Sequence, residues 1–249
     1  MIDRAAAPPP IRLDHVTLAH GPHVLLRDLS GEFAPGSLTA LIGANGAGKT
    51  TLMRALVGLH PLAGGRIDRG GLAPSDVALL PQGSHLDRGF PLSCRDVVAL
   101  GLTARLGPFR AMGRSRLQAV EAALAAVGLP DHADRPIGAL SAGQFQRVLF
   151  ARMMMQDAPV LLLDEPFAGV DAATTADLLA ILHGWHAQGR TIVTVLHDLD
   201  LVHDTFPRTL LLEHGHVAWD TTAAVLADRS LPLAARWRPD WMPTRQHAA

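Results

Sequence analysis

The chain has 249 residues, a formal net charge of −1 and 48% hydrophobic residues, which is enough apolar material for one large domain or two small ones. The balanced charge argues against a protein that grips nucleic acid through a broad basic face, and the hydrophobicity argues against intrinsic disorder. A single cysteine, Cys94, excludes an intrachain disulfide and a four-cysteine zinc site. No apolar run approaches the roughly 20 residues that a membrane-spanning helix needs, so we expect a cytosolic protein that can still dock on a membrane protein.

The N-terminal third favours strands. Apolar residues alternate loosely over residues 11–33 around Gly21 and Pro22, which predicts a pair of antiparallel strands with a turn. A strand over 37–42 runs into glycines and is followed by a helix over 49–59, and strand-like segments lie at 66–68 and 77–80. From about 84 to 140 the composition changes to alanine, leucine and arginine with helical spacing, which predicts an inserted helical lobe.

The C-terminal half alternates strands and helices. A strand over 160–163, a helix over 172–189 and a strand over 191–196 predict a parallel sheet. The first of these strands is apolar throughout, as expected when both faces of a sheet are covered. Segments 210–212 and 217–219 flank a turn like a hairpin, and residues 229–249 lack periodicity, which predicts a tail. The pattern as a whole indicates the α/β class.

A glycine-rich loop stands between the strand at 37–42 and the helix that begins near 49. Residues 43–50 fit the pattern GxxxxGK[ST], in the context that a phosphate-binding loop requires. Glycines let backbone N–H groups turn toward phosphate oxygens, and the helix start adds partial positive charge. Lys49 can reach the β- and γ-phosphates, and the Thr50 hydroxyl can bind Mg²⁺. The bland alternative, a glycine turn before a helix, is weakened by this context.

Two carboxylates end the apolar strand. Asp164 and Glu165 follow Leu163 directly, and ligands of open α/β sheets bind at the carboxyl ends of the strands. We expect Asp164 to hold Mg²⁺, directly or through water, and Glu165 to polarise an attacking water. Taken alone, two surface acids that end a strand explain the pattern equally well.

A third motif occupies residues 140–147. Ser141 and Gln144 have the capping-box spacing and are followed by apolar residues, so the segment predicts a well-capped helix start. It also resembles the signature sequence of ABC-type ATPases, with Ala142 at the second small position. Other matches to this family are Gln82 as its Q-loop glutamine, residues 169–171 as its D-loop and His197 as its switch histidine.

The resemblance covers about residues 11–228 and implies the P-loop NTPase fold of ABC ATPases. That fold has a mainly parallel core sheet, an N-terminal antiparallel β subdomain and an inserted helical subdomain, here over about 84–158. We therefore expect a single ABC ATPase domain over 11–228 and a C-terminal tail over 229–249. The family pairs two such domains head to tail, so that each signature contacts the nucleotide on the partner's phosphate loop.

The resemblance also implies ATP and Mg²⁺ as cofactors and assigns roles to single residues. Catalytic roles fall on Glu165, His197 and Gln82, and Mg²⁺ ligation on Thr50, Gln82 and Asp164. The implied nucleotide-binding residues are Gly43, Ala44, Asn45, Gly46, Ala47, Gly48, Lys49, Thr50, Thr51, His20, Ser141, Gly143 and Gln144. His20 stands where the family usually stacks an aromatic residue on adenine, and the chain contains no tyrosine; imidazole offers less stacking surface.

Two classes of function compete. The leading interpretation is the ATP-hydrolysing subunit of an importer, and the alternative is a soluble ABC ATPase of DNA maintenance or translation, or a transporter ATPase for a non-metal substrate. The interval between Lys49 and Ser141 contains no heptads, unlike the coiled coil of repair ATPases, and the chain holds only one cassette.

Within importers, residues 81–101 and 163–171 resemble the subgroup for zinc, manganese or iron uptake, with zinc or manganese favoured here. The implied partners are transmembrane permease subunits, a second copy in an ATP-dependent homodimer and, indirectly, a solute-binding protein, but no nucleic acid. The implied location is the cytoplasmic face of the inner membrane. The histidine pairs at 183 and 186 and at 214 and 216 are best explained as surface residues, because two ligands do not complete a metal site.

Overall fold

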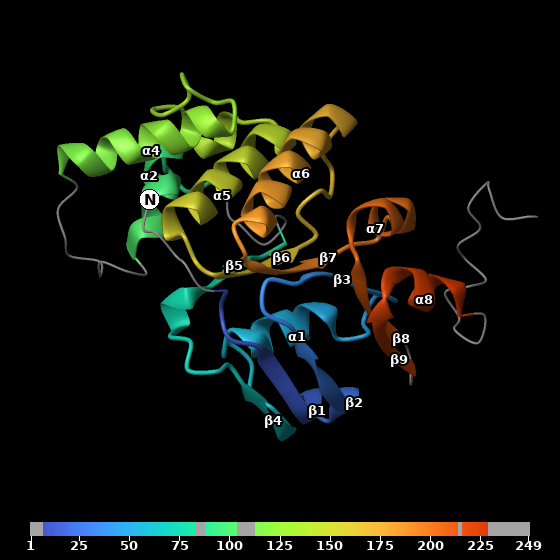
Figure 1. The fold of residues 1–249 in the computed structure, drawn as a ribbon. Helices are drawn as coiled ribbons and strands as arrows, with labels where there is room; N and C mark the ends of the chain where they lie inside the picture. Colours follow the sequence, from blue (N-terminus) through green and yellow to red (C-terminus); the bar gives the residue numbers. More distant parts are fainter. Residues whose placement is uncertain (1–6, 83–87, 104–112, 214–215, 229–249) are drawn as a thin grey trace, which may run out of the picture.

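The structure, a computed structural model, describes residues 7–82, 88–103, 113–213 and 216–228. Its strands form two sheets (Figure 1). The smaller sheet is antiparallel, with the order β2-β1-β4, and the larger has six strands in the order β5-β6-β7-β3-β8-β9. The strands are β1 Ile11–His20, β2 His23–Phe33, β3 Leu38–Gly43, β4 Gly64–Asp68, β5 Val77–Leu80, β6 Val160–Asp164, β7 Thr191–Val195, β8 Arg208–Glu213 and β9 His216–Thr221.

The large sheet is parallel except at one edge. Strands β5, β6, β7, β3 and β8 pair in parallel, and β9 joins β8 antiparallel. The predicted parallel core, the predicted hairpin at 210–219 and the predicted N-terminal antiparallel pair are therefore confirmed. Because the parallel strands share one direction, the loops after β3, β5, β6 and β7 all leave from the same edge of the sheet.

Helices cover both faces of the large sheet (Figure 1). They are α1 Lys49–Leu56, α2 Cys94–Ala99, α4 Arg114–Ala126, α5 Ala142–Gln156, α6 Ala172–Ala187, α7 Leu199–Thr205 and α8 Thr222–Ala227, with 3-10 turns at Pro74–Asp76, Leu100–Leu102 and Ile137–Ala139. The helix expected over 49–59 ends at Leu56, since Gly58 adopts a φ of 81°. None of the helices among the described residues is long and apolar enough to span a membrane.

The sheet separates two hydrophobic cores. In β6, Leu161 and Leu163 pack into the core that contains α5 and α6, whereas Val160 and Leu162 pack into the core that contains α1 and the antiparallel sheet. This alternation is the period of two that a strand imposes on its side chains. All five residues of β6 are buried, as predicted for a strand covered on both faces. The signature helix and the phosphate-loop helix thus lie on opposite faces of one sheet (Figure 1).

Candidate active site

The phosphate loop follows β3 and leads into α1. Gly43 has a φ of 140°, and a Cβ there would lie 1.7 Å from the backbone oxygen of Leu212 on the neighbouring strand. Gly48 caps α1 with a φ of 93°, and Gly46 has a φ of 81°, where an added Cβ would have no heavy atom within 4 Å. The sheet therefore demands glycine at Gly43, and Gly46 leaves open space beside the backbone where a phosphate group can approach.

Lys49 is held inside its own loop. Its side chain is almost fully buried, and its Nζ donates hydrogen bonds of 2.9 Å to the carbonyl oxygens of Gly43 and Ala44. Burial lowers the pKa of Lys49, and the carboxylates of Glu165 and Asp164 oppose that shift. A cation in this position faces the loop that would receive the phosphates, and it can exchange two neutral carbonyl oxygens for anionic phosphate oxygens.

Asp164 ends β6 and is 2% exposed. Burial raises the pKa of its carboxyl group, the Thr50 side chain opposes that shift, and the charge of Glu165 adds to it. Its Oδ1 atom is buried and has no hydrogen-bond partner among the described residues. An unsatisfied buried carboxylate oxygen beside a threonine hydroxyl fits Mg²⁺, which takes oxygen ligands and is usually bound through one or two carboxylates and substrate phosphates.

Glu165 lies between two of the predicted catalytic side chains. Gln82 Nε2 donates to Glu165 Oε2 over 2.8 Å, and His197 Nε2 lies 2.7 Å from Glu165 Oε1. The backbone at Glu165 has a φ of 52°, which is rare for a residue other than glycine. These three residues follow β5, β6 and β7, so the strand order brings together groups that are far apart in the sequence.

The signature segment begins α5. Ser141 Oγ accepts from Gln144 N, and Ser141 N donates to Gln144 Oε1, each over 3.1 Å, so the predicted capping box is confirmed. Gly143 is buried, and a Cβ there would lie 3.2 Å from Thr174 Oγ1. No hydrogen bond within the described parts of the chain joins this segment to the phosphate loop. The structure thus gathers one set of predicted residues around Glu165 and Lys49 and leaves the signature set separate.

The D-loop-like segment connects β6 to α6. Gly169 adopts a φ of 71°, and Asp171 caps α6 by accepting a 2.8 Å hydrogen bond from Thr174 N. These bonds lower the pKa of the Asp171 carboxyl group. The loop is therefore shaped by a tight turn and a charged cap, directly beside the segment that carries Glu165.

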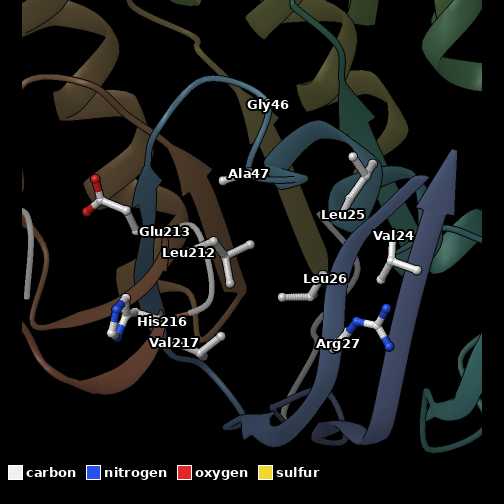
Figure 2. A pocket seen from close by; sticks show the side chains of 10 residues that line it. All are labelled: Val24, Leu25, Leu26, Arg27, Gly46, Ala47, Leu212, Glu213, His216 and Val217. Carbon is white, nitrogen blue, oxygen red and sulfur yellow. The ribbon is translucent and has the colours of Figure 1, made fainter.

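His20 lies at the exposed end of β1, opposite His23 in the hairpin. A cavity of about 360 Å³ opens instead between β2, the phosphate loop and the hairpin of β8 and β9 (Figure 2). Its lining residues are Val24, Leu25, Leu26, Arg27, Gly46, Ala47, Leu212, Glu213, His216 and Val217. The sequence argument missed this cavity because its walls are ordinary strand residues that only the pairing of distant strands brings together. Adenine contact by His20 stays a prediction.

The histidine pairs at 183 and 186 and at 214 and 216 are predicted from the sequence to be surface residues and not metal ligands. Within the described ranges, no three His, Cys, Asp or Glu side chains form a group that could hold a metal ion. His183 is exposed and His186 is half-buried on α6. His214 lies outside the described residues.

Comparisons with known proteins agree with one another. The family model described as "ABC transporter" matches residues 26–168. The chain is 38% identical to the manganese transport system ATP-binding protein MntB of Bacillus subtilis, over 89% of this chain and 90% of that protein. It is 40% identical to the zinc transport system ATP-binding protein TroB of Treponema pallidum, over 81% and 77%.

A solved structure of a putative metal-chelate type ABC transporter in an inward-facing conformation superposes with a TM-score of 0.81. The two chains are 24% identical, and the match covers 93% of this chain and 90% of the other. At that identity the likeness concerns the fold, and it confirms the α/β architecture with its mainly parallel core sheet.

Proposed function

The chain belongs to the ABC transporter family of ATP-binding proteins, and from that premise we propose that it energises the uptake of a divalent metal ion, with manganese and zinc as the candidates. Members of this family are ATPases that work with membrane permeases and dimerise. The metal is suggested by relatives such as MntB of Bacillus subtilis and TroB of Treponema pallidum, whose names are those of manganese and zinc transport proteins.

One arrangement carries the catalytic part of the proposal. The Glu165 carboxylate is held by Gln82 on one oxygen and by His197 on the other, next to a buried lysine and a buried aspartate. A carboxylate oriented in this way can accept the proton of a water molecule that attacks the γ-phosphate. His197 would orient that water and the γ-phosphate, and Gln82 would connect the site to the helical subdomain expected over about 84–158.

Phosphate binding falls to the loop at 43–50. Its backbone N–H groups and Lys49 would bind the β- and γ-phosphates, and the start of α1 would add its partial positive charge. Thr50, Asp164 and Gln82 would hold Mg²⁺, which supplies charge neutralisation at the phosphate oxygens when it is bound. The buried Oδ1 atom of Asp164, which has no hydrogen-bond partner in the described part of the chain, supports this assignment.

The signature residues would act on a second copy. Ser141 and the Gly143 backbone lie at the start of α5, on the face of the sheet opposite α1. They would contact the γ-phosphate bound to the partner's phosphate loop, so that two ATP molecules are sandwiched in a head-to-tail homodimer. We place this homodimer on the cytoplasmic face of the membrane, bound to permease subunits that receive metal from a solute-binding protein.

Phe90, Pro91 and Phe109 are candidates for apolar contact with the permease. Phe90 is exposed at 59%, which suits a contact residue, whereas Phe109 lies outside the described residues. Introducing a charge with Phe90→Glu should uncouple transport while leaving basal ATP hydrolysis, and crosslinks that place the permease elsewhere would contradict the assignment.

Growth of a deletion strain in metal-chelated medium tests the substrate. Cellular manganese and zinc are quantified in the deletion strain, in a strain complemented with the wild type and in one complemented with Lys49→Ala. We expect a growth defect that one of these metals relieves and that only the wild-type copy repairs. Normal metal content together with a defect in amino-acid, sugar or lipid handling would remove the metal assignment and leave the ATPase assignment in place.

A further inference from the structure

The segment that follows Gln82 runs beside the segment that precedes Ser141. Backbone hydrogen bonds of 3.0 Å join Cys94 N to Arg135 O and Ile137 N to Leu92 O, and Ser93 forms a bridge with Pro136. The approach to the signature helix is therefore attached, through its backbone, to residues that come shortly after the Q-loop glutamine. A shift of one segment must move the other.

Arg88 adds a side-chain connection at the end of this pairing. One of its terminal nitrogens donates to the backbone oxygen of Leu140, with a longer contact of 3.5 Å to the oxygen of Ile137. Its guanidinium carbon lies 4.9 Å from the ring centroid of Phe145. Leu140 directly precedes Ser141, and Phe145 lies one turn after it. A single guanidinium group thus contacts the chain on both sides of the signature serine.

The backbone around Arg88 is shaped for this contact. A Cβ at Gly138 would lie 2.9 Å from the backbone oxygen of Arg88, although the conformation of Gly138 itself is open to other residues. Glycine is therefore needed there for close approach and not for a special turn. The loop ahead of the signature therefore packs directly on the backbone of Arg88, which brings this residue close to the segment that its side chain contacts.

Arginine is the side chain that suits both contacts at once. Its planar group can donate hydrogen bonds in its plane while its face lies over an aromatic ring, whereas a lysine ammonium is a point charge that cannot be divided between the two in the same way. Ser141 is the N-cap of α5, and its Oγ and N are already used in the capping box. The contacts around the first turn of α5 therefore set the direction of its N–H groups. Arg88 provides two of these contacts, one with Leu140 and one with Phe145.

We propose that Arg88 is a positioning residue that fixes the signature turn for the nucleotide bound to a second copy of the chain. The proposal rests on the proposed head-to-tail homodimer. Because Arg88 is only six positions from Gln82, and Gln82 contacts Glu165, the same short stretch of chain touches the catalytic carboxylate of its own protomer and orients the signature that serves the partner. Arg88 acts through Ser141 and the first turn of α5 and needs no contact with ATP.

ATP-driven dimerisation in a Glu165→Gln background provides the first test, measured by sedimentation velocity. We expect Arg88→Met to weaken the ATP-bound dimer about tenfold or more, the size of effect found between residues in contact, and to leave ATP affinity at low protein concentration unchanged. Arg88→Lys should recover only part of the loss. Equal dimer dissociation constants with and without Arg88→Met would overturn the proposal.

Arg69→Met is the matched control. Arg69 also uses its guanidinium to bind backbone oxygens, those of Ala55 and Leu56 at the end of α1, over 2.7 and 2.6 Å. This variant should lower the thermal midpoint and leave dimerisation intact, which separates general destabilisation from loss of the signature geometry. If Glu165→Gln alone shows no ATP-driven dimer, the homodimer fails and Arg88 has no partner to serve. If that dimer forms and Arg88→Met matches Arg69→Met, only the role of Arg88 fails.

Mixed dimers provide the second test. Arg88→Met and Lys49→Ala are each expected to hydrolyse ATP slowly. In their heterodimer, one site combines an intact phosphate loop with an intact signature, so the mixture should regain activity that neither variant has. Ser141→Ala mixed with Lys49→Ala is the benchmark for such recovery. Recovery in the benchmark without recovery for Arg88→Met would show that Arg88 serves its own protomer and would overturn the assignment.

Discussion

Replacing Glu165 by glutamine should remove the general base while keeping the hydrogen-bonding geometry of the site. Glutamine has the same shape, so its amide oxygen can still accept from Gln82 Nε2, and its amide group can still face His197. What is lost is the ability to take a proton from water. The nearby negative charge is lost as well, and since that charge raises the pKa of Asp164, the substitution should move the pKa of Asp164 back toward its ordinary range.

Two magnitudes are expected for Glu165→Gln, one for the turnover rate and one for the free energy of unfolding. A positioned general base contributes about 10²–10⁴-fold to the rate, so turnover should fall by that factor while ATP binding persists. The side chains of His197 and Glu165 are 47% and 19% exposed, so solvent screens their attraction, and the stability change should stay within about 1 kcal/mol. For a chain of this size that corresponds to a shift in Tm of about 2–4 °C.

The assay uses the purified chain at saturating Mg²⁺ and ATP, with phosphate release and Tm measured on the same preparations. Lys49→Ala is the contrasting variant, because removing the positive charge should weaken nucleotide binding itself. An unchanged turnover in Glu165→Gln would remove the general base from Glu165. A fall in turnover accompanied by a much lower Tm would mean that the residue is structural.

Four further substitutions test the phosphate-binding edge of the sheet and the separate signature segment. Asp164→Asn should raise the free energy of unfolding without nucleotide and abolish the stabilisation by Mg²⁺ and ATP. Burial raises the pKa of Asp164 above 3.8, so the ionised carboxylate destabilises the folded chain. Urea titrations should therefore show the full gain in the free energy of unfolding above the raised pKa, and its loss as the pH falls toward 3.8. Gly43→Ala should prevent folding, because its Cβ would meet the Leu212 oxygen at 1.7 Å, whereas Gly46→Ala should give a folded circular dichroism spectrum with weakened nucleotide binding. Ser141→Asp should keep the Tm, because aspartate also caps a helix and only loss of the cap would cost about 1 kcal/mol. It should lower the ATPase rate, because its carboxylate would face the partner's γ-phosphate. A rate equal to that of the wild type would contradict the signature role.

Local patterns predicted much of this fold. The apolar run at 160–163 became a strand buried on both faces, and the phosphate loop lies between strand and helix as its sequence requires. The helices α7 and α8 were missed, although each has a capping residue. Asp198 accepts from Leu201 N, and Thr221 accepts from Ala224 N. Six or seven residues give too little periodicity to reveal a helix unless the cap is noticed first.

The parts that escaped prediction are those created by strand order and tertiary contact. The sequence placed Gln82, Glu165 and His197 at the ends of separate strands, but only the order β5-β6-β7 makes those ends neighbours. The contact of Arg88 with Leu140 joins residues 52 positions apart, so no local sequence pattern predicts it. Family resemblance supplied the roles of the single residues, and physical reasoning from composition could not have done so.

The active edge of the sheet breaks several local rules together, and this is informative about function. Lys49 and Asp164 are buried charges, Asp164 Oδ1 has no partner within the described part of the chain, and Glu165 has a positive φ. Each of these features lowers the stability of the protein when no ligand is bound. A bound nucleotide with its metal ion would provide a partner for each buried charge, so the ligand should stabilise the folded chain through the same groups that destabilise it. Violations of local stability rules are expected at a functional site, where selection acts on ligand binding as well as on stability.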